Sequence, residues 1–235
     1  MARLPRLALA GPVHLVNLRC RAGQTMFVDD EDRRRYSVAL LESSRERGVA
    51  VHAYALLDDQ LLLLASAPEP ASLGRFMQAV ARRYVRPFNR RHVRTGALWE
   101  GRFRSTVIDP ASFLLVCMRW VEQAPVREGR VAMAGDWVWS SAAHHAGRKV
   151  DSIVTEHAAY WQLGNTPFER QATYVRESAV MLSDATVNQL LAAARHGWPL
   201  GPAMFLQSLA DATERPVQRR PRGRPAKSTS RTKVG

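Results

Sequence analysis

The sequence predicts an α+β fold of the ferredoxin-like class, with one antiparallel sheet and helices on one face of it. Two observations predict this class: the chain holds four strand-like segments, and helix-like segments follow the first, third and fourth of them. Their order is strand, helix, strand, strand, helix, strand, and then one more helix, which is the order of a split βαβ arrangement. Residues 1–150 should form this domain, residues 151–212 a small helical C-terminal extension, and residues 213–235 a disordered basic tail.

The first half of the predicted domain follows from apolar patterns. Val13–Cys20 alternates and carries β-branched residues, which favours a strand. Residues 29–48 favour a helix, because an aspartate can cap it, acidic residues fill its first turn and a glycine ends it. Val49–Leu57 and Gln60–Ser66 are apolar runs that predict two strands, joined by a tight turn of two aspartates.

The second half contains a long helix, a fourth strand and a last helix. Apolar residues repeat at spacings of three and four over residues 72–92, which predicts an amphipathic helix that Pro87 should kink or end. Ala97–Asp109 alternates aromatic and small residues with charged ones, which predicts a strand with two arginines on one face. Pro110 then opens a helix that Pro125 stops.

Charge points to the class of partner. The chain of 235 residues has a formal net charge of +13, and its last 21 residues hold eight basic residues and no acid. Arginine, which dominates, binds phosphate bidentately and stacks on bases, so a nucleic-acid partner is favoured. A GC-rich genome would also enrich arginine over lysine, but it does not explain the net charge. The apolar runs are too short to cross a membrane, and the two cysteines form no zinc motif and suit a reducing cytosol.

Four stretches of the chain resemble one protein family. They read "FNRRHVRTGALWEGRFRS", "VHAYALL", "APVREGRV" and "WVWSS". They are similar to the single-tyrosine HUH transposases, in the branch associated with repetitive extragenic palindromes (REP), over about residues 3–139. The resemblance implies the HUH type of ferredoxin-like fold, a bacterial cytoplasmic protein associated with the nucleoid, and hairpin or single-stranded DNA as partner. Relatives of this branch often act as dimers, which leaves a homodimer as an open expectation.

The resemblance also implies a chemistry for which this chain lacks the residues. Family members cut and rejoin DNA with a divalent cation such as Mg or Mn, held by a His-hydrophobe-His triplet, and with a tyrosine that forms a phosphotyrosine link. In the same frame this chain has Gln60 and Leu62 at the two histidine positions and Trp120 at the tyrosine. We therefore expect no metal or other cofactor, and a DNA-binding protein that has lost strand transfer.

Two other interpretations stay open. One is an active strand transferase with relocated catalytic residues, in which Asp58 and Asp59 bind the cation or Tyr84 attacks the phosphate, although core packing is the simpler role for Tyr84. Adjacent residues point apart, so His144 and His145 are expected to be surface or interface histidines rather than a metal pair. The other is a decaying reading frame whose product folds without a selected role, against which the intact hydrophobic periodicity argues.

Arginines supply the expected DNA contacts, because neutralising phosphate needs no metal. The long helix carries Arg82, Arg83, Arg86, Arg90 and Arg91, and basic positions of the family motifs are matched by Arg102, Arg104 and Arg127. The alternative is a solvated helix face that keeps the protein soluble. In the tail, Arg222, Gly223, Arg224 and Pro225 resemble an AT-hook core, which lies in the minor groove of A·T-rich duplex DNA. The alternative is a tail that binds phosphate without specificity.

Overall fold

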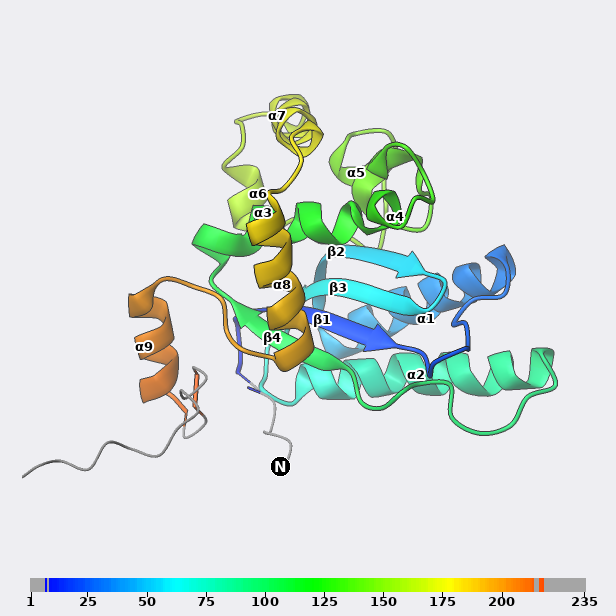
Figure 1. The fold of residues 1–235 in the computed structure, drawn as a ribbon. Coiled ribbons are helices and arrows are strands. Elements are labelled where there is room, and N and C mark those ends of the chain that lie inside the picture. Colours follow the sequence, from blue (N-terminus) through cyan, green and yellow to red (C-terminus); the bar gives the residue numbers. More distant parts are fainter. Residues whose placement is uncertain (1–6, 8, 214–215, 218–235) are drawn as a thin grey trace, which may run out of the picture.

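A four-stranded antiparallel sheet forms the centre of the molecule (Figure 1). The computed structural model describes residue 7, residues 9–213 and residues 216–217. The strands are β1 (Val13–Arg19), β2 (Ala50–Leu57), β3 (Gln60–Ser66) and β4 (Arg104–Ile108), and their order across the sheet is β2-β3-β1-β4. This arrangement confirms the predicted ferredoxin-like fold.

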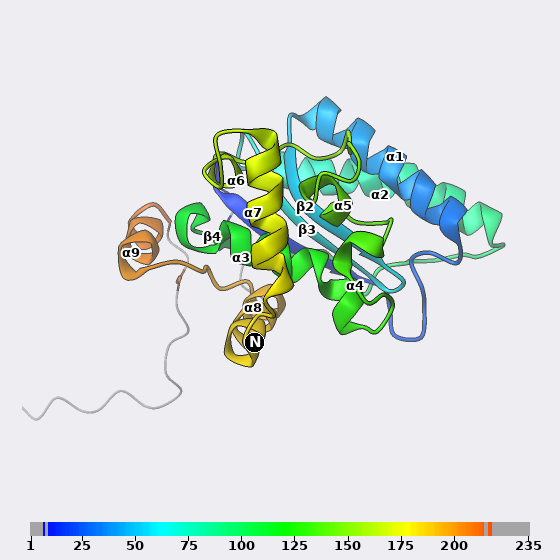
Figure 2. The same cartoon turned by 90° about the horizontal axis from the view of Figure 1, so that it is seen from above.

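Helices α1 (Asp30–Arg47) and α2 (Ser72–Arg91) cover one face of the sheet (Figure 2). The side chain of Asp29 caps α1 by accepting a hydrogen bond from the backbone of Asp32, and Gly48 ends the helix with a left-handed φ of 62°. The apolar stripe of α2 is buried in a core that includes Tyr36, Phe76 and Tyr84. This helix continues through Pro87, so the proline does not end it.

A second layer of helices covers the opposite face. Of its helices, α3 (Pro110–Glu122) and α8 (Asp184–His196) contact the sheet, and α6 (Ala158–Trp161) and α7 (Pro167–Ala179) pack farther from it. The core of this layer includes Leu62, Trp120 and Leu190. A capping box at Thr166 and Glu169 begins α7. The prediction of helices on one face therefore holds for α1 and α2 but missed this second layer. The short elements α4 (Ala124–Arg127), η1 (Ala134–Asp136), α5 (Ala142–His145) and α9 (Ala203–Asp211) complete the described fold.

Both outer strands are paired on their outer side with short connecting segments. Beside β2, the backbone N–H of Leu56 donates to Trp139, and that of Thr155 donates to Val51. Beside β4, the backbone N–H of Leu200 donates to the carbonyl oxygen of Val107, and the carbonyl oxygen of Leu200 accepts from the backbone N–H of Asp109. The sheet thus has little exposed edge along the described chain. No helix among the residues described here is long and apolar enough to cross a membrane.

The fourth strand is shorter than its alternating pattern predicted. It spans Arg104–Ile108 instead of Ala97–Asp109, because its ladder with β1 begins at the pair Asn17 and Arg104. Residues 97–103 form a loop that is tied to the end of β1, where the backbone of Glu100 donates to Arg19 at 3.1 Å. Arg102 therefore lies in a loop and not on a strand face.

Candidate nucleic-acid interface

Polar side chains gather at one end of the sheet, on the face that α3 and α8 cover. Arg19 of β1 lies directly opposite Gln60 of β3, and Asn17 of β1 lies opposite Arg104 of β4. Directly opposite residues in an antiparallel ladder point to the same face, and so do residues two apart on one strand. These four side chains therefore share one face, at the end where β3 and β4 begin.

A cavity of about 290 Å³ lies over this end of the sheet. The sheet supplies its floor, α3 and α8 supply walls, and the loop before β4 supplies a third wall. Its lining consists of Asn17, Arg19, Gln60, Glu100, Gly101, Arg102, Arg104, Trp120, Leu191 and Arg195. We call it the arginine cavity.

Positive charge dominates the arginine cavity, because four arginines line it against one carboxylate, that of Glu100. Arg19 is partly neutralised by Asp59, at 3.1 Å between Nη2 and Oδ2. For the other three arginines, Arg102, Arg104 and Arg195, no carboxylate within the described part of the chain lies at ion-pair distance. Guanidinium groups that have so few carboxylates beside them attract an anion.

Arg104 and Thr106 of β4 fix the end of α8 beside the cavity. The Nη1 of Arg104 donates to the backbone carbonyl oxygen of Arg195 at 2.5 Å. The hydroxyl of Thr106 donates to the backbone carbonyl oxygen of Ala193 at 2.7 Å. Basic donors and hydroxyls satisfy the last carbonyls of a helix in this way. The position of Arg195 is therefore set by contacts with β4, about 90 residues earlier in the chain.

Two polar atoms of the cavity lining are buried without a partner in the described residues, namely Oδ1 of Asn17 and Nε1 of Trp120. Trp120 is 2% exposed and belongs to the core beneath α3. Arg127 lies over its indole ring, 5.1 Å from the centroid, and donates to its backbone carbonyl. Desolvation lowers the pKa of Arg127 to about 10, so this arginine stays charged at neutral pH. It does not line the cavity.

Replacing Trp120 with Phe is expected to change the free energy of unfolding by less than about 1 kcal/mol, because losing an unpartnered buried N–H offsets part of the lost packing. Replacing Trp120 with Ala should cost about 3–5 kcal/mol, as for other large buried aromatics. Urea unfolding followed by circular dichroism measures both. Equal losses for the two variants would mean that Nε1 has a partner, such as a bound water.

Three positions match catalytic residues of the family that the sequence resembles, and the structure brings only two of them into one cavity. Gln60 and Trp120 both line the arginine cavity. Leu62, 1% exposed, lies in the apolar core on the same side of the sheet and does not line the cavity. A donor atom at position 62 would therefore meet apolar side chains.

The residues considered for relocated catalysis have other partners. Asp58 pairs with Arg33 and Arg130, and Asp59 pairs with Arg19, so both aspartates anchor the predicted turn between β2 and β3. The hydroxyl of Tyr84 donates to the carbonyl of Met26 in the core on the α1 and α2 face. This face is opposite the arginine cavity. In the part of the chain that is described, no group of three or more His, Cys, Asp or Glu side chains is placed to hold a metal ion.

The prediction of surface histidines at positions 144 and 145 is wrong. His145 is fully buried, and its Nδ1 lies 2.6 Å from Oε1 of Glu122. The same buried carboxylate accepts hydrogen bonds from Ser141 and from the hydroxyl of Tyr174. His144 is half-buried and accepts a bond from the backbone of Asp151 at 3.1 Å. The short helix α5 lies beneath α7, and this tertiary contact, which local sequence does not encode, buries the pair.

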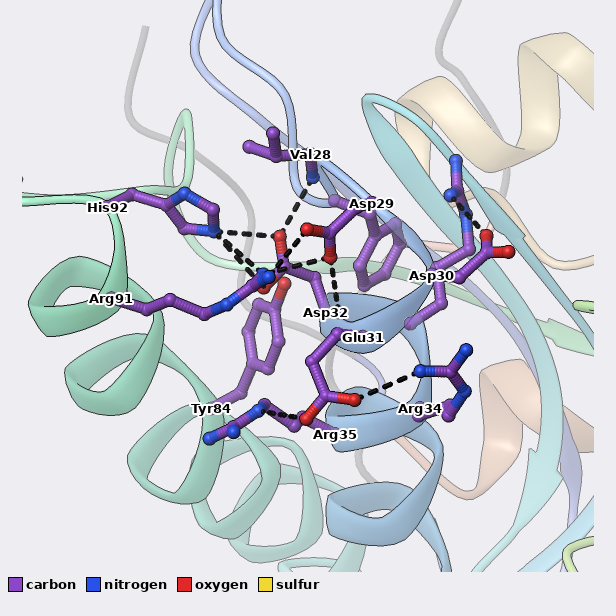
Figure 3. Close-up of polar contacts among 12 residues, drawn as sticks. Val28, Asp29, Asp30, Glu31, Asp32, Arg34, Arg35, Tyr84, Arg91 and His92 are labelled. Carbon is purple, nitrogen blue, oxygen red and sulfur yellow. Dashed lines mark hydrogen bonds and ion pairs between the residues drawn. The ribbon is translucent and has the colours of Figure 1, made fainter.

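The arginines of α2 divide into paired and unpaired members. Figure 3 shows Arg91 reaching between Asp29 and Asp32 at the start of α1, with the ring of His92 beside Asp32. The guanidinium of Arg91 holds the pKa of the exposed Asp29 carboxyl well below its usual range. Arg91 thus joins the two helices of one layer.

Arg83 is also paired, with Glu42 and Glu46 of α1. Arg82, Arg86 and Arg90 are exposed, with no carboxylate at ion-pair distance among the described residues. Because α2 covers the face opposite the arginine cavity, the predicted DNA-binding arginines form separate groups. The motif of Arg222, Gly223, Arg224 and Pro225 lies outside the described residues.

Comparison with known proteins identifies a related fold. No protein-family model matches the sequence, and no curated protein matches it. Among solved structures, the fold is similar to that of a REP-associated tyrosine transposase bound to a REP hairpin, with a TM-score of 0.56. The match covers 68% of this chain and 93% of the other. The chain has a transposase-like fold. At 15% sequence identity, this likeness shows the fold alone.

Proposed function

We propose that this chain binds DNA, in hairpin or single-stranded form, and does not cut it. The observation that carries the proposal is the arginine cavity, which contains Gln60 and Trp120 where the family resemblance expects a histidine and a tyrosine. Guanidinium groups hold phosphate by charge and by paired hydrogen bonds, without a metal. The transposase-like fold supports a hairpin ligand, because the similar solved protein is bound to one.

The environment of the tyrosines supports the loss of strand transfer. All five tyrosines of the chain are buried, at 3% exposure or less. Burial raises the pKa of each hydroxyl, which opposes formation of the phenolate that would attack phosphate. The apolar surroundings of Leu62 add to this argument, because an imidazole at that position would be buried without a polar partner.

Two further surfaces would add affinity. The exposed arginines of α2, at positions 82, 86 and 90, would contact phosphates on the other side of the molecule. The basic tail would bind A·T-rich duplex through Arg222 and Arg224. A DNA ligand would place the protein on the bacterial nucleoid.

A binding titration in EDTA tests the proposal. We expect the full chain to bind a labelled hairpin with single-stranded flanks more tightly than a matched duplex. Replacing Arg102 and Arg104 together with Ala should weaken hairpin binding about tenfold, or about 1.4 kcal/mol, and should reduce the salt dependence, because phosphate contacts are lost. Fluorescence anisotropy at two salt concentrations measures both effects, and the stoichiometry shows whether one or two copies bind each hairpin.

Matched variants separate this site from general charge. Arg45 and Arg176 are exposed, and replacing both with Ala removes the same charge from other surfaces. This control should bind almost as wild type, and replacing Arg222 and Arg224 should affect duplex more than hairpin. Any one of three results would contradict the proposal: equal binding of the hairpin and the duplex, a cavity variant that binds like the control, or binding that depends on the tail alone.

A further inference from the structure

Two packed helices form part of the boundary of the arginine cavity. Arg195 and Leu191 of α8 form one wall, and Trp120 of α3 forms the next. These two helices pack together in one core, through Trp120 and Leu190, and the hydroxyl of Thr106 holds α8 against β4. On the side of Trp120 and Arg195, a bound strand would therefore meet packed helices. This shape suits a strand that ends in the cavity rather than one that passes through it.

The charge of the cavity also suits a terminal group. Four arginines face one glutamate, and Asp59 offsets part of Arg19 from outside the lining. An internal phosphodiester carries one negative charge. A terminal phosphate monoester carries a charge of about −1.5 to −2 at neutral pH and offers three terminal oxygens. The larger charge matches the excess of guanidinium groups more closely.

The donors available in the cavity are numerous enough for such a group. Arg102 has no ion-pair partner along the described chain, and Arg104 uses one donor for the carbonyl of Arg195. Each guanidinium presents up to five N–H donors in a planar fork that fits two phosphate oxygens. The cavity volume of about 290 Å³ lies near the lower end of the range for small-ligand pockets, which fits a phosphate with its sugar.

We propose that the arginine cavity binds the terminal phosphate of a DNA strand, as a metal-independent end-recognition site. This proposal rests on the proposed DNA binding and specifies which part of the DNA the cavity takes. The shared chemistry is a phosphate monoester, which a strand can carry at its 5′ or its 3′ end. Recognition needs no bond formed or broken.

The test compares single-stranded oligonucleotides of one sequence with a 5′-phosphate, a 3′-phosphate or hydroxyls at both ends, in EDTA, with the full chain. We expect one phosphorylated form to bind about tenfold more tightly than the hydroxyl form at pH 8. The advantage should shrink at pH 5.5, because the monoester loses its second charge below its pKa of about 6. It should vanish when Arg102 and Arg104 are replaced with Ala and persist when Arg45 and Arg176 are replaced with Ala.

The outcomes separate this inference from the proposed function. Equal binding of phosphorylated and hydroxyl strands, with a loss for both in the cavity variant, would overturn end recognition and leave DNA binding intact. A phosphate advantage that survives in the cavity variant would overturn the inference as well, because another basic surface would then hold the end. If the wild type binds no single strand, end recognition is overturned for strands, and the hairpin titration decides whether DNA binding itself holds. In that case the melting temperature is measured with inorganic phosphate. A rise for the wild type and not for the cavity variant would still support a phosphate site.

Discussion

A variant with Glu122 replaced by Ala is expected to lose about 3–5 kcal/mol of unfolding free energy. The carboxylate is buried and accepts hydrogen bonds from Ser141, His145 and Tyr174, which lie on or beside helices of the second layer. Removing it leaves three buried donors without an acceptor and opens a cavity beneath α3. Since domains are typically stable by about 5–15 kcal/mol, this loss would unfold much of the protein on mild heating.

Replacing Glu122 with Gln provides the matched control. One side-chain oxygen can still accept from both Ser141 and His145, and the amide can donate to the hydroxyl of Tyr174. We expect this variant to lose about 1 kcal/mol, the net value of a typical hydrogen bond. Urea unfolding followed by tryptophan fluorescence measures both variants. Similar losses for Ala and Gln would show that the charge, and not the set of hydrogen bonds, holds the layer together.

Replacing Leu62 with His is expected to cost about 2–4 kcal/mol, because an imidazole would be buried among apolar side chains without a partner. Combining it with Gln60→His and Trp120→Tyr restores the residues that the family resemblance expects. We still expect no covalent protein–DNA adduct with Mg²⁺ or Mn²⁺, because the core around Leu62 does not leave a metal ligand free to turn toward the cavity.

Leu62→Met conserves volume and polarity and should cost less than about 1.5 kcal/mol, which makes it the control for packing. Denaturant unfolding gives the stability of each variant. A denaturing gel of the triple variant, incubated with labelled DNA and Mn²⁺, detects an adduct. A triple variant as stable as the wild type that also forms an adduct would show that the scaffold retains a catalytic geometry.

The fold followed from the sequence where local patterns and tertiary structure agree. The apolar runs of β2 and β3 with their aspartate turn, and the caps of α1, were sufficient to locate these elements. The fourth strand was predicted too long, because alternation over residues 97–103 continues beyond the last partner residue that β1 provides. The second helical layer was missed because the apolar face of each short C-terminal helix does not show which surface it covers.

The sequence predicted the residues of the candidate site less completely than it predicted the fold. Gln60, Trp120, Arg102 and Arg104 were named from sequence, and the structure brings them to one cavity. Arg195 and Arg19 were missed, since no local pattern distinguishes them from other arginines. Arg83 and Arg91 were named as DNA contacts, but the structure pairs them with carboxylates on α1, about 40 and 60 residues earlier, a relation that only the packing of the two helices creates.

The segments paired with the outer strands have a consequence for synthesis on the ribosome. The outer hydrogen-bond partner of β4 is Leu200, which is synthesised nearly 100 residues after the strand itself. The outer partners of β2, Trp139 and Thr155, are also synthesised well after that strand. A nascent chain that stops before those residues would present two unpaired strand edges, which are templates for intermolecular pairing. Truncated products ending before about residue 200 should therefore collect in inclusion bodies, while the full chain, with its edges paired, resists aggregation.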